Sequence, residues 1–296
     1  MKLRNYYILF FAFIPFAISA QSNILNASTP ADVGVQNIDQ QQSDLDSFLD
    51  YKFIDDRDIL WSKIVYEKID LSERLNFPLL FPIDDNKYEE TRKSLWRVIR
   101  ENIIDGNITE IYRDDNDNFL EKNKLKDVDP DGAGGDNGYI SKVSFTPVIN
   151  GIERDPVFLK SSEITGYMIK GMWYFDKRRG ELDYRLLGIK PIGLDIKAED
   201  QSSETVKNSE LFWIWYPSIR KILHTEKVFN DRSNANQISF DQLLISRRFS
   251  SYIFKEDNMY GDRPISAYKR KGLDYILESQ RIKNEILDFE QDLWNR

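Results

Sequence analysis

The spacing of apolar residues along the chain predicts helices. Apolar side chains recur every three to five positions in several stretches, which places them on one face of a helix. Ser239 and Gln242 resemble a capping box, which favours a helix start at that point. The predicted helices cover residues 58–75, 88–104, 239–248 and 266–294. The last of them carries an apolar stripe at helical spacing, formed by Ile282, Ile286, Phe289 and Leu293.

Alternating residues and turn signals between these helices predict antiparallel strands. The clearest case is a hairpin in which Arg178-Arg179-Gly180 joins two alternating runs. The predicted strands cover residues 108–112, 139–146, 172–176, 182–187 and 211–216. Pro217 favours a short helix running to Leu223. Together these elements predict an α+β fold, with several helices packed on predominantly antiparallel strands and a flexible amino-terminal tail.

The amino-terminal residues have the order of a secretion signal. Lys2 and Arg4 precede an apolar run, and the small residues Ser19 and Ala20 follow it. The run is shorter than the roughly 20 residues that a membrane-spanning helix needs, so cleavage after Ala20 is expected. The following residues are too polar to offset chain entropy and are expected to be flexible. The predicted organisation is a signal peptide over 1–20, a flexible tail over 21–54 and a folded domain over 55–296.

Cysteine content and charge restrict the class of protein. The chain has no cysteine, which excludes disulfides, thiolate metal sites and lipid attachment through an amino-terminal cysteine. Lys and Arg number 41 against 49 Asp and Glu, and this acidic balance argues against nucleic acid as a partner. With the secretion signal, these features predict a soluble protein of the periplasm or the cell exterior.

No catalytic constellation stands out in the sequence. The single histidine, His224, is expected to interact with carbonyl groups at a helix end. Acidic pairs such as Asp55-Asp56 and Asp84-Asp85 fall in no recognisable motif and are expected in solvated loops. The sequence therefore predicts a protein that is not an enzyme, with no catalytic residue and no cofactor.

One long, acidic and glycine-rich excursion offers the best local metal signal. It runs over 114–138 and is expected to be an exposed loop. Asp127, Asp129 and Asp131 alternate before Gly132, as in a calcium loop, but Gly138 stands where a bidentate glutamate belongs. No metal site is predicted, and calcium binding by this loop stays open.

A cluster of aromatic residues carries the remaining signal for function. Phe212, Trp213, Trp215 and Tyr216 place four rings in five positions, so a strand there presents rings on both faces. One face is expected in the core. The other is either core as well or an exposed platform for carbohydrate or protein.

Several groups of residues, taken in order, resemble the GldN/PorN family of gliding motility proteins. They include Trp173-Tyr174-Phe175-Asp176-Lys177, Arg247-Arg248-Phe249-Ser250-Ser251 and Asn258-Met259-Tyr260. Further matching stretches lie at residues 58–71, 76–79, 187–189, 212–220, 278–283 and 290–294. The resemblance covers nearly all of residues 55–296.

This resemblance implies a non-enzymatic structural subunit of the type IX secretion system. Such a subunit is periplasmic and associated with the outer membrane, where it self-associates in a ring with the lipoprotein GldK/PorK for protein secretion and gliding. It also implies contact with the periplasmic part of the motor protein GldM/PorM. The alternative from the residues alone is a secreted carbohydrate- or protein-binding module that uses exposed aromatics.

The terminal helix and the aromatic cluster are the predicted interface. Chain termini are often loose unless they are docked, and tryptophan is enriched among residues that dominate binding energy. The candidate interface residues are Trp213, Trp215, Ile282, Ile286, Phe289, Leu293 and Trp294.

Overall fold

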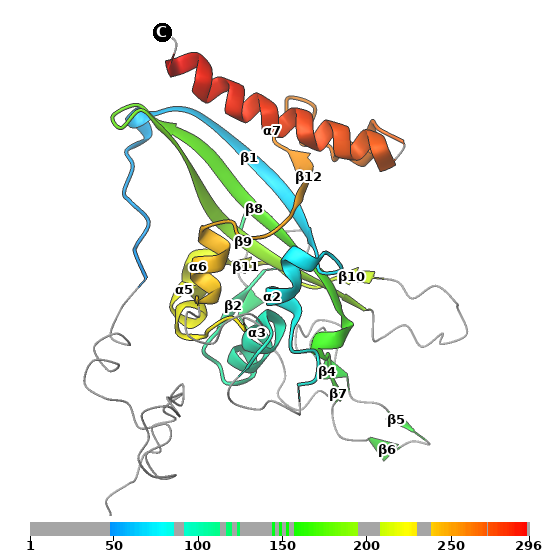
Figure 1. Cartoon of the computed structure of the whole chain (residues 1–296). Coiled ribbons are helices and arrows are strands. Elements are labelled where there is room, and N and C mark those ends of the chain that lie inside the picture. The colour runs from blue at the N-terminus through cyan, green and yellow to red at the C-terminus, as the bar shows by residue number, and fades with distance from the viewer. Residues whose placement is uncertain are drawn as a thin grey trace, which may run out of the picture. The chain divides into compact units, whose positions relative to one another are not determined.

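Long antiparallel strands form the centre of the fold (Figure 1). The strand order is β10-β9-β8-β1-β12, and β11 pairs with β9 off this path. The strands are β1 (Ile59–Asp70), β8 (Ile164–Asp176), β9 (Glu181–Leu194), β10 (Asn208–Glu210), β11 (Ile214–Trp215) and β12 (Tyr252–Glu256). All of their pairings are antiparallel, so the predicted α+β class is confirmed.

Five α-helices, four short 3₁₀ helices and three small two-stranded sheets complete the described elements. The computed structural model describes residues 48–85, 92–112, 117–119, 123–124, 144–145, 148–149, 152–153, 157–194, 208–229, 238–270 and 272–294. The helices are α2 (Phe77–Leu80), α3 (Leu95–Ile104), α5 (Tyr216–Thr225), α6 (Phe240–Ile245) and α7 (Gly272–Trp294). The small sheets pair β2 (Glu110–Ile111) with β3 (Asn123–Lys124), β4 (Ser144–Phe145) with β7 (Val157–Phe158), and β5 (Val148–Ile149) with β6 (Ile152–Glu153). No helix in these ranges is both long enough and apolar enough to cross a membrane.

Most of the stretch predicted as a helix over 58–75 is strand β1, between β8 and β12, so that prediction is wrong. Val65 and Ile69 face one side of the sheet, whereas Ile64 and Tyr66 pack on the other side. A strand buried on both faces produces apolar residues at mixed spacings, which a helical face imitates. The branched and aromatic composition of this stretch favours the strand.

The predicted hairpin is confirmed and is longer than expected. Asp176 pairs with Glu181, and Gly180 between them has φ +67°, which a residue without a Cβ adopts easily. The paired strands continue to Ile164 and Gly193 at the far end. The expected strand over 211–216 is shorter, because a helix already begins at Tyr216 with Pro217 in its first turn.

The other predicted helices exist with shifted starts. Helix α3 begins at Leu95, where the Ser94 side chain accepts a hydrogen bond from the Arg97 N–H, and it ends at Ile104 as predicted. The terminal helix begins at Gly272, after a 3₁₀ turn over Ile265–Ala267. The predicted strand over 108–112 is reduced to β2, and most of 139–146 lies outside the described residues.

Helix α6 supplies a test of capping. Replacing Ser239 with alanine should lower the free energy of unfolding by about 1 kcal/mol, because the hydroxyl accepts the Gln242 N–H at 3.1 Å. Ser239→Thr keeps the acceptor and should lose clearly less. Urea unfolding followed by circular dichroism measures both, and equal losses would show that the cap is not the cause.

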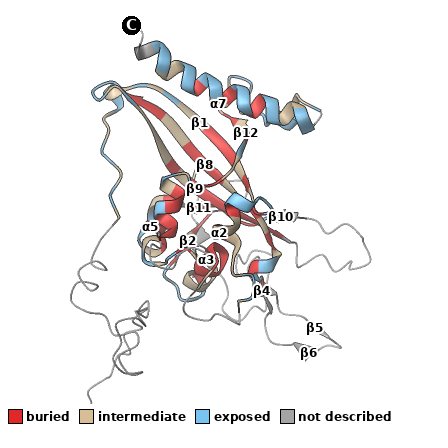
Figure 2. Ribbon diagram, viewed as in Figure 1, coloured by how far each residue is buried: buried red, intermediate tan, exposed pale blue. Residues whose placement is uncertain are grey.

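The two faces of the sheet have different covers, and buried residues run along β1, β8 and β9 (Figure 2). On one face, α3, α5 and α6 lie beside one end of the long strands and bury the largest hydrophobic cluster, while α7 crosses the other end (Figure 1). A second hydrophobic cluster lies between α7 and the sheet. Tyr184 packs against both this cluster and the largest one. On the opposite face lies a third, aromatic cluster around Tyr66, Tyr112 and Trp213.

The folded unit begins before the boundary predicted at Asp55. The Tyr51 hydroxyl donates to the Leu186 carbonyl at 2.9 Å, and the Arg220 guanidinium lies over the rings of Phe48 and Tyr51. Burial raises the pKa of the Tyr51 hydroxyl above its ordinary value. The predicted signal peptide and most of the predicted tail lie outside the described residues.

Candidate protein-interaction surface

The predicted apolar stripe of α7 faces the sheet of its own chain. Ile282 and Ile286 are fully buried and pack with Val65, and the Phe289 ring stacks on Trp61 with 4.7 Å between ring centroids. The stripe therefore attaches the helix to strands β1 and β12. The side chains of Leu293 and Trp294 lie outside the described residues, and the role of the whole stripe in joining subunits stays a prediction.

A second apolar row lies on the outer side of the same helix. Leu273, Ile276 and Leu277 are exposed by 67, 62 and 60 %, and Leu287 further along is exposed by 49 %. This row is not among the predicted interface residues, although its spacing of three and four residues gives a visible signal in the sequence. A helix that is apolar on two sides has one side left for a partner after it docks on its own domain.

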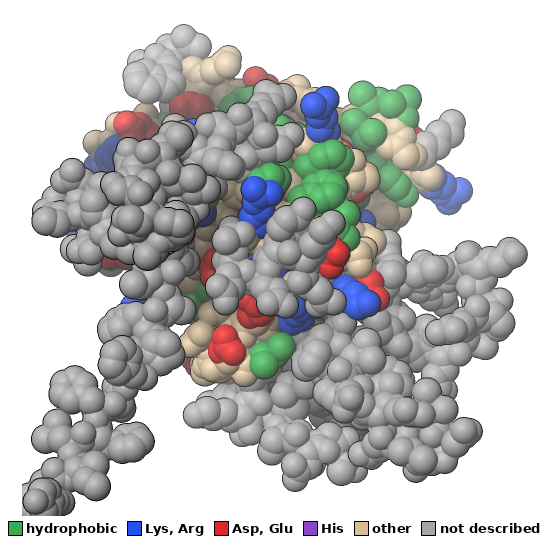
Figure 3. All heavy atoms as spheres, turned by 60° about the horizontal axis from the view of Figure 1, so that its bottom comes forward, with side chains coloured by type: hydrophobic (Ala, Val, Ile, Leu, Met, Phe, Trp, Pro, Cys, Tyr) green, Lys and Arg blue, Asp and Glu red, His purple; other side chains and the backbone are tan. Residues whose placement is uncertain are grey.

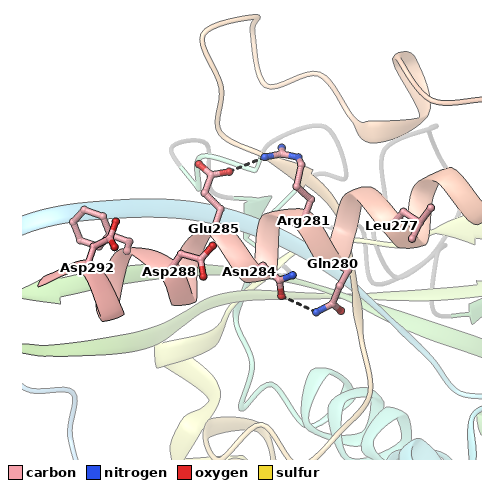
Figure 4. A pocket seen from close by; sticks show the side chains of 8 residues that line it. Leu277, Gln280, Arg281, Asn284, Glu285, Asp288 and Asp292 are labelled. Carbon is pink, nitrogen blue, oxygen red and sulfur yellow. Dashed lines mark hydrogen bonds and ion pairs between the residues drawn. The ribbon is translucent and has the colours of Figure 1, made fainter. Parts of the chain in front are cut away.

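Polar groups continue this outer surface towards the carboxyl end (Figure 4). A shallow hollow runs from Leu277 to Asp292, and the Gln280 amide donates to Asn284 at 2.9 Å along it. Within the described chain, neither Asp288 nor Asp292 forms an ion pair. The outer surface of α7 is thus apolar in its first turns and acidic in its last ones.

Ion pairs fix the flank of α7 against the sheet. Lys63 of β1 pairs with Glu285 at 3.1 Å and with Glu256 at 2.9 Å, while Arg281 pairs with Glu278 and Glu285 at 2.8 Å. Burial tends to raise the pKa of the Glu285 carboxyl, but Lys63 and Arg281 outweigh it and lower that pKa. These ion pairs fix the rotation of the helix about its own axis, so the same side of the helix always faces outward.

The loop after β12 presents a further exposed apolar pair. Asn258 accepts a hydrogen bond from the Tyr260 N–H and its own N–H donates to Asp262, at 3.0 and 2.8 Å. The resulting tight loop leaves Met259 exposed by 89 %. Asn258-Met259-Tyr260, one of the stretches that carry the family resemblance, therefore lies in a surface loop held by hydrogen bonds.

Residues 247–251, which also carry the family resemblance, form internal hydrogen bonds instead of an exposed surface. Arg247 has φ +53° and its guanidinium Nη2 donates to both carboxylate oxygens of Glu67, at 2.8 and 2.9 Å. The Ser251 hydroxyl donates to the same carboxylate, and Lys283 of α7 donates to the Ser251 carbonyl at 2.6 Å. This network joins β1, α7 and the chain that follows α6.

Most of the aromatic cluster is core, contrary to the idea of an exposed platform. Trp213 and Phe212 are buried, and the buried Tyr216 hydroxyl donates to Asp241 at 2.9 Å. Trp215 is half-buried, and the ring of Phe119 lies 5.0 Å from it. Trp213 is thus unavailable as a carbohydrate platform, because the sheet and its neighbours already cover it.

Phe119 also corrects the expectation of a fully exposed excursion over 114–138. Asp117 and Phe119 pack on the sheet, and Phe119 contacts Tyr112 and Trp213 as well as Trp215. The calcium-like run from Asp127 to Gly138 lies outside the described residues. Among the residues that are described, no three acidic or histidine side chains gather as a metal would require.

The remaining candidate groups have structural contacts. His224 lies in the last turn of α5, where its ring forms an edge-to-face pair with Phe48, with 6.1 Å between ring centroids. Asp55 pairs with Arg57 on the surface, as expected for a solvated loop. Asp85 departs from that expectation, because it pairs with Arg100 at 2.8 Å and accepts from Ser161 in a largely buried position.

Charge does not gather in one sign on the face brought forward in Figure 3. Acidic and basic side chains alternate in its described part, with hydrophobic side chains grouped beside them. A nucleic-acid surface is typically lined by a basic tract, and the described part of this face shows both signs of charge.

Comparison with known families gives one extended match. The model of the family described as "Gliding motility associated protein GldN" matches residues 54–295. The match takes in the whole large sheet and all five described helices. A search among curated proteins finds no match to the chain.

Proposed function

Because the chain belongs to the family of gliding motility associated GldN proteins, we propose that it is a structural subunit of the type IX secretion system. The proposed role is non-enzymatic: the subunit self-associates in a periplasmic ring with the outer-membrane lipoprotein GldK/PorK, for protein secretion and gliding. The periplasmic part of the motor protein GldM/PorM is a further proposed partner. Family membership supports the link to gliding motility, and the more detailed assignments are our proposal.

The observation that carries the assembly role is the outer row of α7. Leu273, Ile276 and Leu277 remain exposed although the helix already buries a complete apolar stripe on its inner side. Exposed apolar groups of this kind are costly unless a partner covers them. The ion pairs of the flank keep the row outward, so the surface is preformed for binding.

The secretion signal supports the periplasmic location. If the proposal is right, the mature protein purified from cells should begin at Gln21, because the small residue Ala20 ends the predicted signal. Amino-terminal sequencing of the native protein tests this. A mature protein that still begins at Met1 would contradict export by cleavage.

The outer row can be tested without disturbing the fold. Changing Leu273, Ile276 and Leu277 together to serine should abolish isolation of the lipoprotein with this chain from cell envelopes, and with it secretion. Each of these exposed changes should alter the free energy of unfolding by no more than about 0.5 kcal/mol, which a thermal melt checks.

The matched control uses exposed leucines that are not part of α7. Leu60→Ser and Leu75→Ser remove comparable exposed side chains and should leave isolation of the lipoprotein unchanged. Normal assembly of the triple serine variant would contradict a role for the outer row. Equal loss in the control variant would show that apolar exposure in general, not this surface, drives the association.

A further inference from the structure

A row of side chains crosses five strands on the face of the sheet opposite α7. The strand register places Lys255 of β12 beside Tyr66 of β1, Tyr66 beside Lys170 of β8, Lys170 beside Gly188 of β9, and Gly188 beside Trp215 of β11. We call these five residues the lysine–aromatic row. It sets two ammonium groups around a tyrosine, then a gap at the glycine, then an indole ring.

Two residues of the chain, Asp117 and Phe119, lie on this row as a ligand lies on a receptor. Asp117 accepts hydrogen bonds from the Tyr66 hydroxyl at 2.8 Å and from Lys255 at 3.2 Å, and its backbone carbonyl accepts from Lys170 at 2.6 Å. The Phe119 ring fills the gap at Gly188, where a Cβ would come within 2.4 Å of it. Carboxylate, carbonyl and ring thus each meet a matching group.

Asp117 neutralises only part of the positive charge of the row. Lys170 is buried, yet its ammonium meets a neutral carbonyl of Asp117, and it has no ion pair within the described chain. Burial lowers the pKa of the Lys170 ammonium. Burial tends to raise the pKa of the Asp117 carboxyl, but Tyr66 and the two lysines outweigh it, so that this pKa falls below its ordinary value. A segment with a second carboxylate would satisfy the row better than Asp117 alone.

We infer that the lysine–aromatic row is a binding site for a short peptide segment in which a carboxylate precedes an aromatic ring by two residues. Asp117–Phe119 fills it as a tethered internal ligand, and a matching segment of a partner can take its place. Tethering raises the effective concentration of the internal segment to about the millimolar range, so it holds the site until it is removed or outcompeted. This inference does not depend on the proposed secretion role.

The experiment vacates the site and offers the segment back as a peptide. The host is the mature chain with Asp117→Asn and Phe119→Ala, and the probe is a fluorescent peptide with the sequence of residues 114–122. Anisotropy should show saturable binding to this vacated chain and none to the unaltered chain. Lys255→Gln in the vacated chain should weaken binding about tenfold, because a charge-assisted hydrogen bond is lost.

A blocked variant separates specific binding from general attraction to lysine. Gly188→Ala in the vacated chain places a methyl group where the phenylalanine ring sits, so it should abolish binding while leaving both lysines in place. A thermal melt checks that each host is folded. If the double change prevents folding, Phe119→Ala alone vacates the ring position and keeps Asp117 paired. Absence of saturable binding to a folded host, or binding unaffected by Gly188→Ala, would overturn the inference.

Two further mixtures identify the source of the partner segment. The vacated chain is mixed with a chain that carries Gly188→Ala but keeps its own Asp117 and Phe119. If the two chains form a complex, and the complex is lost when the second chain also carries Phe119→Ala, then the partner segment comes from a second copy of this chain. Peptide binding without such a complex assigns it to a different protein.

Discussion

Replacing Glu67 with leucine should lower the free energy of unfolding by about 3 to 5 kcal/mol. The Glu67 carboxylate is 1 % exposed and holds the Arg247 guanidinium and the Ser251 hydroxyl. Leucine fills similar space, so the loss comes from a largely buried cation left without its counterion, 4.2 Å from the centre of the Tyr184 ring. Urea unfolding at neutral pH measures the effect.

The double variant shows whether the unpaired charge is the cause. Glu67→Leu combined with Arg247→Leu removes both charges and should recover most of the lost stability, since apolar residues often replace a buried pair at little cost. The exposed pair of Arg179 and Glu181 gives the control, and Glu181→Leu should cost less than about 1 kcal/mol. If the double variant is as unstable as Glu67→Leu alone, lost packing and not lost pairing explains the result.

Replacing Ile282 with alanine should cost about 2 to 5 kcal/mol, because its side chain is fully buried between α7 and the sheet. Ile276 on the same helix is the matched control. Its side chain is exposed by 62 %, and Ile276→Ala should change the free energy of unfolding by no more than about 0.5 kcal/mol. Denaturant unfolding gives both values, and hydrogen exchange along α7 shows whether the helix detaches alone.

The contrast between these two isoleucines checks the rotation of the helix. Similar losses at Ile276 and Ile282 would mean that the inner and outer sides of α7 are not those described. A small loss at both would mean that the helix contributes little to the fold. Either result would also remove the basis for assigning the outer row to a partner.

The parts of the fold that depend on neighbouring residues could be predicted from the sequence. The hairpin of β8 and β9 followed from alternation and from Gly180, and the inner stripe of α7 followed from helical spacing. Capping chemistry located the start of α6 at Ser239. Each of these signals is local, because the residues that determine the element lie within one turn or one strand pair.

Features that depend on distant parts of the chain could not be predicted. Strand β1 is apolar on both sides because different clusters cover its two faces, and no local spacing distinguishes it from a helix. Asp117 and Phe119 sit in a polar stretch, and the hydrogen-bond partners of Asp117 on β1 and β8 lie more than 50 residues away. The lysine–aromatic row exists only because the strand register aligns residues from β12 to β11.

The candidate interface also combines features that could be predicted from local sequence with features that could not. Spacing identified α7 as an important helix, but only the structure shows which side its own sheet covers. Trp213 is the opposite case. Its aromatic neighbours in the sequence suggest an exposed platform, but the chain itself buries its side chain. Exposure, not residue type, decides which apolar groups remain for a partner.

If a partner binds α7, the network around Ser251 determines how a force on that helix reaches the rest of the fold. Ser279 of α7 accepts the Ile253 N–H at 2.8 Å, and Lys283 donates to the Ser251 carbonyl, so a pull on the helix is shared with the backbone of β12. From Ser251 the load passes through Glu67 to β1 and through Arg247 to the segment behind α6. Traction on α7 is therefore spread over the sheet and its covering helices, and the edge strand does not have to carry it alone.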